Sequence, residues 1–169
     1  MLDFVASDFF DYLLGLEAKR ASRYSYPFSL LVIEVDRENV PGEVLDFVSG
    51  LIREHRRDTD PVSLARGGDR AEKAIFRLLC SHAGPVQIRL VGERIRRRSE
   101  IQTYRIGREE GVVTFSEGAA CYPYHNTYPE ELSRIAMEMA GKSREEGGNR
   151  FHIPPGPPPM NMGQGNAFG

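Results

Sequence analysis

The stretch VTFSEGAACYP, residues 113–123, decides the fold of this chain. Its β-branched, aromatic and small residues predict a strand, and Pro123 ends that strand because proline cannot donate to a ladder. Residues 127–145 follow with apolar side chains at helical spacing. EGGNRF at 146–151 then supplies two glycines for a turn. The predicted unit is a strand, a helix, a turn and a short last strand at 151–153.

The rest of the chain supplies further elements of both kinds. Apolar patterns and turn residues predict a helix at 7–23, a buried strand at 28–35, a helix opening at Pro41, a hairpin of 62–65 with 74–80, a helix from Gly84 to about Arg98, and a second hairpin of 101–106 with 112–121 around a turn at 108–111. After the first helix the order is βαββαββαβ. This order predicts an α+β fold, a mixed sheet with helices packed on it.

Composition bounds the class of protein. The chain has 169 residues, which suits one domain, expected at 1–153, and the uncharged Pro- and Gly-rich residues 154–169 predict a flexible tail. The net charge of -2 does not favour nucleic acid as a partner. No apolar run reaches the ~18 residues of a membrane span, and the start lacks the basic residues of a signal peptide, so we expect a cytoplasmic protein. Cys80 and Cys121 lie in apolar segments and are expected to be buried, reduced thiols.

Residues 113–151 resemble a known family. VTFSEGAACYP and GGNRF are similar to the VTVSIGVAAYP strand and the GGNRV turn in the C-terminal half of GGDEF domains, the bacterial diguanylate cyclase family. The resemblance has no gap from residue 136 to 151 and extends over about 7–153, weakest at 37–73. It implies the ferredoxin-like palm of nucleotide cyclases, a mixed and mainly antiparallel sheet flanked by helices.

The resemblance also indicates where an active member would bind GTP and two divalent ions. In the family, carboxylates after the first strand and in the signature hairpin hold the metals, which neutralise charge and activate the nucleophile. Here the first strand ends Glu34-Val35-Asp36, with Glu34 at the ligand position, and the hairpin retains Gly67, Gly68 and Asp69. Arg144 stands where the family has a phosphate-facing Lys.

Other catalytic positions depart from the family. The loop after Asp36 is several residues shorter and lacks the phosphate-binding Lys, Gly42 replaces the Asp that reads guanine, and Arg70 follows the hairpin's Asp69. An arginine beside a site meant for two cations is repulsive. We therefore expect vestigial positions only, with no catalytic residues, no cofactor, no metal and no cyclase activity.

A second nucleotide site is suggested by the family's product-binding Arg-x-x-Asp. Arg57 and Asp60 fit that pattern, with Arg89 or Arg94 of the third helix as a second guanidinium. An arginine can clamp a phosphate or the Hoogsteen edge of guanine, and an aspartate can accept from guanine N–H groups. The alternative is a charged helix end followed by an Asp60-Pro61 turn, with the arginines in solvent. In either case Arg57 and Asp60 are expected to be exposed.

Glu117 departs from the family in another way, because the family has an aliphatic residue at that position of the strand. Alternation places Glu117 on the face of Val113 and Phe115. A carboxylate on an inward face needs a partner, and Arg77 is a candidate.

Three functions stay open. The first is a degenerate, catalytically inactive GGDEF-like signalling module that binds cyclic di-GMP, another nucleotide, or a protein partner or second copy. The second is an active diguanylate cyclase that makes cyclic di-GMP from two GTP. The third is an interaction domain without a ligand.

Overall fold

The structure is a computed structural model that describes residues 4–66 and 73–156. This part of the chain contains both helices and strands. The elements are α1 (Ser7–Tyr24), β1 (Phe28–Val35), α2 (Gly42–His55), β2 (Val62–Arg66), β3 (Ala74–Ser81), α3 (Pro85–Ile101), β4 (Tyr104–Ile106), β5 (Glu109–Gly111), β6 (Phe115–Tyr122), α4 (Pro129–Glu145) and β7 (Arg150–His152). The predicted hairpin residues Gly67, Gly68 and Asp69 and most of the predicted tail lie outside the described residues.

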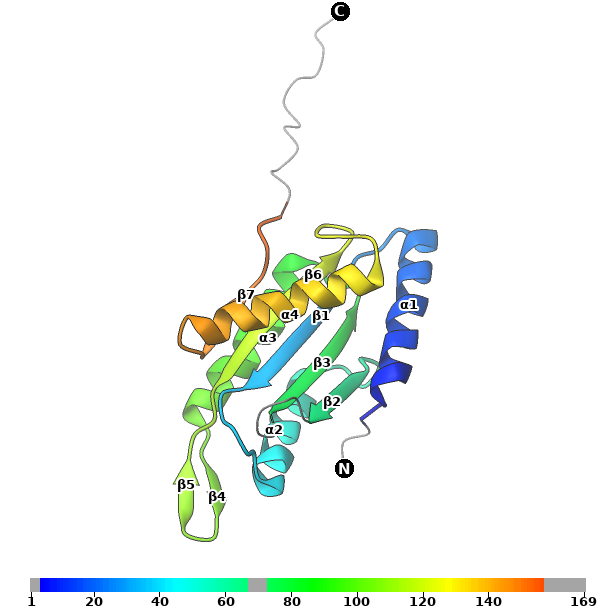
Figure 1. The fold of residues 1–169 in the computed structure, drawn as a ribbon. Helices are drawn as coiled ribbons and strands as arrows, with labels where there is room; N and C mark the ends of the chain where they lie inside the picture. The colour runs from blue at the N-terminus through cyan, green and yellow to red at the C-terminus, as the bar shows by residue number, and fades with distance from the viewer. Residues whose placement is uncertain (1–3, 67–72, 157–169) are drawn as a thin grey trace, which may run out of the picture.

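A five-stranded sheet in the order β2-β3-β1-β6-β7 forms the centre of the molecule (Figure 1). All its pairs are antiparallel except β6 with β7, which are parallel. All eight residues of β1 are buried, and six of them are apolar, as expected for a strand covered on both faces. The fold is therefore the predicted mixed, mainly antiparallel α+β sheet flanked by helices.

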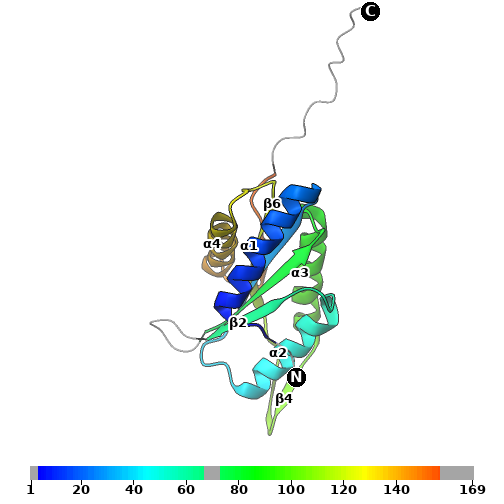
Figure 2. The ribbon, with the colours of Figure 1, turned by 90° about the vertical axis from the view of Figure 1, so that its right-hand side faces the viewer.

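Two helices cover each face of the sheet. On one face α2 and α3 enclose a core that includes Ile33, Phe76 and Phe115. On the other face α1 and α4 enclose a second core that includes Phe28 and Val32. Figure 2 shows α3 and α4 on opposite sides of the sheet. The alternation of side chains along each strand divides the apolar residues between these two layers.

The backbone of helix α4 packs directly against the backbone of β6. A Cβ built at Gly118 would be 2.1 Å from the backbone nitrogen of Ala140 and 2.3 Å from the carbonyl oxygen of Ala136, so a side chain cannot fit there. Ser143 reinforces the contact because its hydroxyl donates a 2.7 Å hydrogen bond to the carbonyl of Glu117. The sequence Gly118-Ala119-Ala120 in β6 thus sets how closely the last helix approaches the sheet.

The second predicted hairpin is wrong in its pairing. Helix α3 continues to Ile101, supported by ion pairs of Glu93 with Arg97 and of Arg96 with Glu100, four residues apart. Gly107, at φ 60°, sets the turn, so the small hairpin pairs 104–106 with 109–111. Residues 112–114 then lead into β6, which pairs with β1 and β7 and not with β4.

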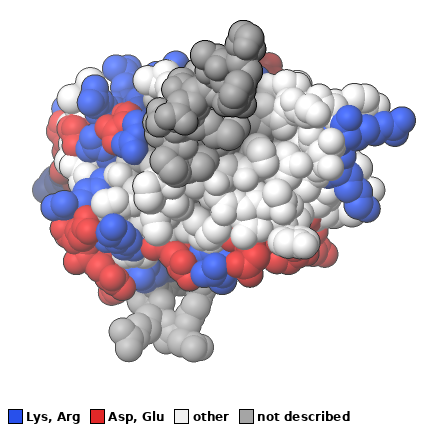
Figure 3. Space-filling view, turned by 90° about the horizontal axis from the view of Figure 1, so that it is seen from above, with Lys and Arg blue, Asp and Glu red and all other residues white. Residues whose placement is uncertain are grey.

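At one end of the molecule, charged residues lie mainly toward the edges of the surface. Seen from above, side chains other than Lys, Arg, Asp and Glu cover most of the centre of the surface, with charges toward its edges (Figure 3).

Cys80 and Cys121 are buried free thiols, as predicted. Of the helices within residues 4–66 and 73–156, none is long and apolar enough to cross a membrane.

Candidate functional site

Glu34 lies at the end of β1 with its carboxylate between two cations. Its side chain is only 4% exposed. The Nη1 atom of Arg144, on α4, lies 2.9 and 2.7 Å from the two carboxylate oxygens, and Lys73 Nζ lies 3.0 Å from Oε1. Three segments far apart in the sequence thus meet at this carboxylate, and its charge is compensated within the protein.

Asp36 ties the same end of the sheet together. Its Oδ1 accepts a 2.5 Å hydrogen bond from the Ser116 hydroxyl. Its Oδ2 accepts 2.8 Å bonds from the Thr114 hydroxyl and from the backbone N–H of Asn149. Gly148, at φ 76°, brings the α4–β7 turn close, because a Cβ there would lie 2.8 Å from the Asp36 carboxylate. The GGN turn that the sequence singled out is therefore built around Asp36.

A cavity of about 310 Å³ opens between these groups and the loop after β1. Glu34, Asp36 and Arg144 all line it, together with Lys73 and Gly148. The structure therefore brings together three of the positions assigned to the vestigial nucleotide site. Within the described residues no three His, Cys, Asp or Glu side chains gather as a possible metal site, and Asp69 lies outside that part of the chain.

Arg57 and Asp60 form a closed turn between α2 and β2. Asp60 Oδ2 accepts hydrogen bonds from the backbone N–H of Arg57 at 3.2 Å and from its Nε at 3.4 Å. Arg57 Nη2 donates a 2.5 Å bond to the carbonyl of Ser81. The Arg57 side chain is 57% exposed, but that of Asp60 is only 4% exposed. The expectation that both are exposed is thus wrong for Asp60, since the turn folds its carboxylate inward to hold Arg57.

A second cavity, of about 450 Å³, lies between this turn and α3. Arg57, Asp60 and Arg94 line it, with the Gln87 amide and Leu90 among the other side chains. Arg89 does not line this cavity, because its guanidinium lies 5.1 Å from the centre of the Phe151 ring. Of the two arginines proposed on α3, the structure brings only Arg94 to the Arg-x-x-Asp turn.

Charged side chains of both signs line this second cavity, namely the guanidiniums of Arg56, Arg57 and Arg94 and the carboxylates of Glu54 and Asp60. Burial lowers the pKa of His55, and the nearby Arg94 and Arg98 guanidiniums lower it further. Burial likewise raises the pKa of the Cys80 thiol, with Asp60 adding to that shift. The cavity therefore combines guanidiniums and carboxylates with the His55 imidazole and the Cys80 thiol, whose pKa shifts disfavour their charged forms.

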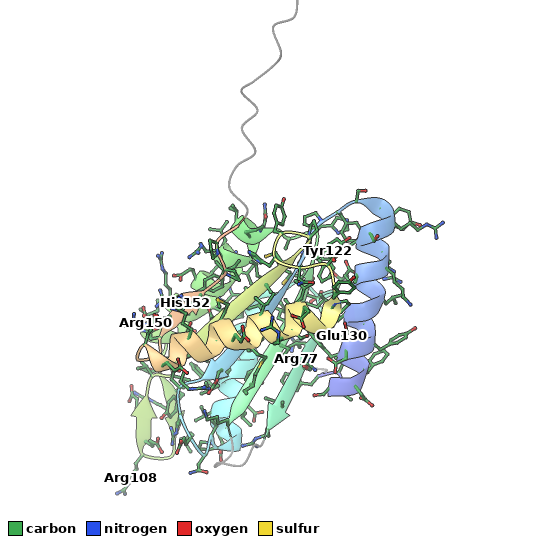
Figure 4. All side chains as sticks on the ribbon, turned by 45° about the horizontal axis from the view of Figure 1, so that its top comes forward. Arg77, Arg108, Tyr122, Glu130, Arg150 and His152 are labelled. Carbon is green, nitrogen blue, oxygen red and sulfur yellow. The ribbon has the colours of Figure 1, made fainter. Side chains whose placement is uncertain are left out.

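Glu117 is buried on β6 without the predicted partner. It is 0% exposed, and neither carboxylate oxygen has a hydrogen-bond partner among the residues that the structure describes. Arg77 lies on the other face of the sheet, where it contacts Asp11 at 2.6 Å and lies over the Phe10 ring (Figure 4). The prediction of a Glu117–Arg77 pair is wrong because Arg77 is paired with Val32 in the sheet and Glu117 with Ile33, so the two side chains point to opposite faces.

What covers Glu117 is α3. A Cβ built at Gly92 would lie 2.9 Å from Glu117 Oε2 and 2.6 Å from the Phe151 ring. Burial raises the pKa of Glu117 well above its usual range, Glu93 and Asp36 raise it further, and Arg96 opposes them. The glycine in α3 therefore admits a carboxyl group that the helix closes off from solvent.

Two residues of these cavities were missed from the sequence. Lys73 comes just before β3, and its approach to Glu34 follows from the register that pairs Glu34 with Ile75. Gln87 is in the first turn of α3, where its Oε1 accepts a 3.0 Å hydrogen bond from the backbone N–H of Gly84. Only the alternation of β3 could have indicated Lys73, and only once the register was known.

Comparisons with solved structures identify the fold. The chain is similar to the GGDEF domain of YfiN, also called TpbB, from Pseudomonas aeruginosa, with a TM-score of 0.80, 19% identity, and coverage of 90% of this chain and 98% of that one. It is also similar to the FimX GGDEF domain from the same organism, with a TM-score of 0.75, 20% identity and coverage of 89% and 94%. The GGDEF domain of DgcB from Caulobacter crescentus, solved in complex with c-di-GMP, matches with a TM-score of 0.77, 16% identity and coverage of 89% of each chain. No protein-family model matches, and no curated protein matches at a significant level.

Proposed function

We propose that this domain, which has the GGDEF fold, is a receptor for cyclic di-GMP that does not synthesise it. The observation that carries the proposal is the 450 Å³ cavity in which Arg57, Asp60 and Arg94 come together. The DgcB domain, of the same fold, was crystallised with this ligand. Cyclic di-GMP offers two phosphates and two guanine edges, which match guanidinium forks and an amide.

In this proposal Arg57 contacts the ligand and Asp60 positions Arg57. Asp60 holds the Arg57 Nε, and Ser81 holds one Nη atom, so the planar fork is oriented before a ligand arrives. Preorganisation reduces the entropy lost on binding. Arg94 approaches from α3 and supplies the second guanidinium. Gln87 Oε1 already accepts from the Gly84 N–H, and its second lone pair can accept from a guanine N–H group.

The absence of synthesis is proposed from the state of Glu34. A divalent ion at that carboxylate would have to displace both Lys73 and Arg144, which already compensate its charge. The shortened loop after Asp36 and Gly42 in place of an acidic residue support the same proposal. Asp36 is committed to three hydrogen bonds that hold β6 and the α4–β7 turn.

Isothermal titration of the whole chain with cyclic di-GMP tests the receptor proposal. We expect saturable binding that is roughly five- to a hundredfold weaker in Arg57→Ala, because ligand groups then lose partners worth about 1–3 kcal/mol. Arg53→Ala is the matched control, since Arg53 is an exposed arginine on α2, just before the Arg57 turn, that does not line the cavity. Asp60→Ala is expected to weaken binding and also to lower the melting temperature, because Asp60 is buried.

Two outcomes would overturn the proposal. Equal affinity of the wild type and Arg57→Ala would place the ligand elsewhere, and no binding by the wild type would favour an interaction domain without a nucleotide. The active cyclase is the second candidate, because Glu34 and Asp36 keep the oxygen-ligand chemistry of a metal site. The test is incubation with GTP and Mg²⁺ or Mn²⁺, with the products separated by chromatography. Metal-dependent formation of cyclic di-GMP would establish that candidate.

A further inference from the structure

The outward side of α3 carries one stripe of residues at helical spacing. Leu90, Arg94, Arg97 and Ile101 follow each other at steps of four, three and four, so they share one side of the helix. Leu90 is 62% exposed and Ile101 is 74% exposed. The opposite side of the helix is buried against the sheet through Ile88, Gly92, Ile95 and Ser99. We refer to the four outward residues as the α3 stripe.

A groove of about 460 Å³ runs along the α3 stripe. All four stripe residues line it, with Glu93 and Arg98 on α3 and His55 at the end of α2. The groove is therefore a concave surface with an apolar residue at each end and guanidinium groups between them. A side chain spacing of this kind is what one helix presents to another when they pack side by side.

The arginines on this surface form few ion pairs with residues of their own helix. Within residues 4–66 and 73–156, neither Arg94 nor Arg98 forms an ion pair, and Arg97 has a single carboxylate, that of Glu93, at 3.6 Å. The outer side of α4 is different, because Arg134 there pairs with both Glu131 and Glu138. The α3 groove thus keeps a positive charge that the α4 surface lacks. Burial lowers the pKa of His55 in the groove wall, and the charges of Arg94 and Arg98 add to that shift.

This charge decides between possible occupants. A second copy of the chain packed stripe to stripe would bring arginines against arginines, which is unfavourable. A bilayer is flat, whereas Leu90 and Ile101 line a concave groove. A helix with acidic residues in the middle of its contact side and apolar residues at both ends complements the groove in shape and charge.

We propose that the α3 stripe is the docking surface for an acidic amphipathic helix of a partner protein. Apolar residues of that helix pack against Leu90 and Ile101, and its Asp or Glu side chains lie opposite Arg94 and Arg97. The proposal stands independently of cyclic di-GMP binding. Because Leu90 and Arg94 also line the cavity at the Arg57 turn, the two ligands would compete if both bind.

The experiment uses a synthetic helical peptide of about 18 residues, roughly 27 Å long, and the whole chain. One peptide carries Leu at the two outer contact positions and Glu at the two middle ones, and its control carries Lys in place of Glu. Fluorescence anisotropy is expected to show binding of the Glu peptide at least about tenfold tighter than of the Lys peptide, weakening as salt rises.

A charge exchange in the protein makes the test specific. The double variant Arg97→Glu/Arg98→Glu, in which Arg94 is unchanged, is expected to lose binding of the Glu peptide and to gain binding of the Lys peptide. Ile101→Glu should weaken the binding of the Glu peptide by about tenfold through loss of an apolar contact. Ile101 does not line the Arg57 cavity, so cyclic di-GMP affinity should stay unchanged in this variant, and circular dichroism should show an intact fold because the side chain is exposed.

Three results would overturn the proposal. One is equal binding of both peptides, and another is a preference that the charge exchange does not reverse. The third is binding of vesicles that contain phosphatidylserine with loss of that binding in Ile101→Glu, which would assign the stripe to a membrane surface instead.

Discussion

Two buried glutamates on neighbouring strands have opposite surroundings. Glu34, near the end of β1, is in contact with the Lys73 ammonium and the Arg144 guanidinium. Glu117, in the middle of β6, lies under Gly92 and the Phe151 ring, and its oxygens have no hydrogen-bond partner among the described residues. The two strands are hydrogen-bonded to each other, and Glu34 is opposite Ser116, next to Glu117. The same type of side chain is therefore compensated in one place and not in the other, only one residue apart in register.

The difference shows how position decides what a buried charge does. Glu34 lies at a strand end, where the segment before β3 and the end of α4 can deliver cations to it. Glu117 lies within β6 beneath a helix, where, among the residues that the structure describes, the Arg96 guanidinium alone opposes its raised pKa. Removing the partners of a compensated buried charge destabilises a protein, whereas replacing an uncompensated one with an apolar residue can stabilise it.

The largest effect is expected when Glu34 loses its cations. The double variant Lys73→Met/Arg144→Met leaves a carboxylate with 4% exposure uncompensated. We expect the free energy of unfolding to fall by about 2–4 kcal/mol, less than the ~3–5 kcal/mol of a fully buried pair because both cations partly face solvent. Urea denaturation of the variant and the wild type measures this change.

The control for that variant removes the carboxylate as well. Adding Glu34→Leu to the double variant should recover most of the lost stability, since no buried charge remains. A triple variant as unstable as the double one would show that Lys73 and Arg144 act through packing and not through charge compensation.

A gain of stability is expected at Glu117. Because its pKa is raised in the folded protein, its protonated form contributes stability that is fully present below the unfolded value near 4.5. That contribution is lost as the pH rises through the folded pKa. Glu117→Ile should therefore be more stable than the wild type at pH 8 by about 1–3 kcal/mol, with a smaller difference at pH 5.

Taking the difference between variant and wild type at each pH cancels the titration of His55 and His125, whose lowered pKa values act in the opposite direction. Glu117→Gln separates charge from polarity, because the amide cannot ionise and should show the same loss of pH dependence. A stability difference that does not change with pH would argue against a Glu117 with a raised pKa.

The smallest effect is expected at the C-terminal residues. Truncation after Ile153 removes an uncharged Pro- and Gly-rich sequence with few residues suited to a core. Thermal melts of the full and shortened chains should agree within a few degrees. A large drop would mean that these residues contribute to the packed domain.

Most of the fold followed from local patterns. The mostly apolar residues 28–35 indicated a strand covered on both sides, and residues 113–145 indicated a strand followed by the last helix. The second hairpin was misplaced for local reasons as well. Ion pairs extend α3 to Ile101, and Gly107 takes the left-handed conformation that sets the turn earlier than expected.

The site residues were harder to predict because their partners come from other elements. The Arg57 motif was visible in the sequence, but burial of Asp60 depends on how the turn closes on β3 through Ser81. Which of Arg89 and Arg94 faces that turn depends on the rotation of α3 over the sheet. Glu117 and Arg77 were assigned to one face, but faces can be compared between strands only when the register is known.

The central place of β1 in the sheet also bears on how the protein is made. β1 lies between β3 and β6, and Ser29 on β1 reaches Cys121 on β6 across 92 positions of sequence with a 2.9 Å hydrogen bond. During synthesis this mostly apolar strand is made before β6, so one of its two edges has no partner until the ribosome has passed residue 122. The nascent chain therefore has an unpaired edge of β1 while residues 36–122 are being translated. Such an edge is open to aggregation, or to a chaperone, until β6 closes the sheet.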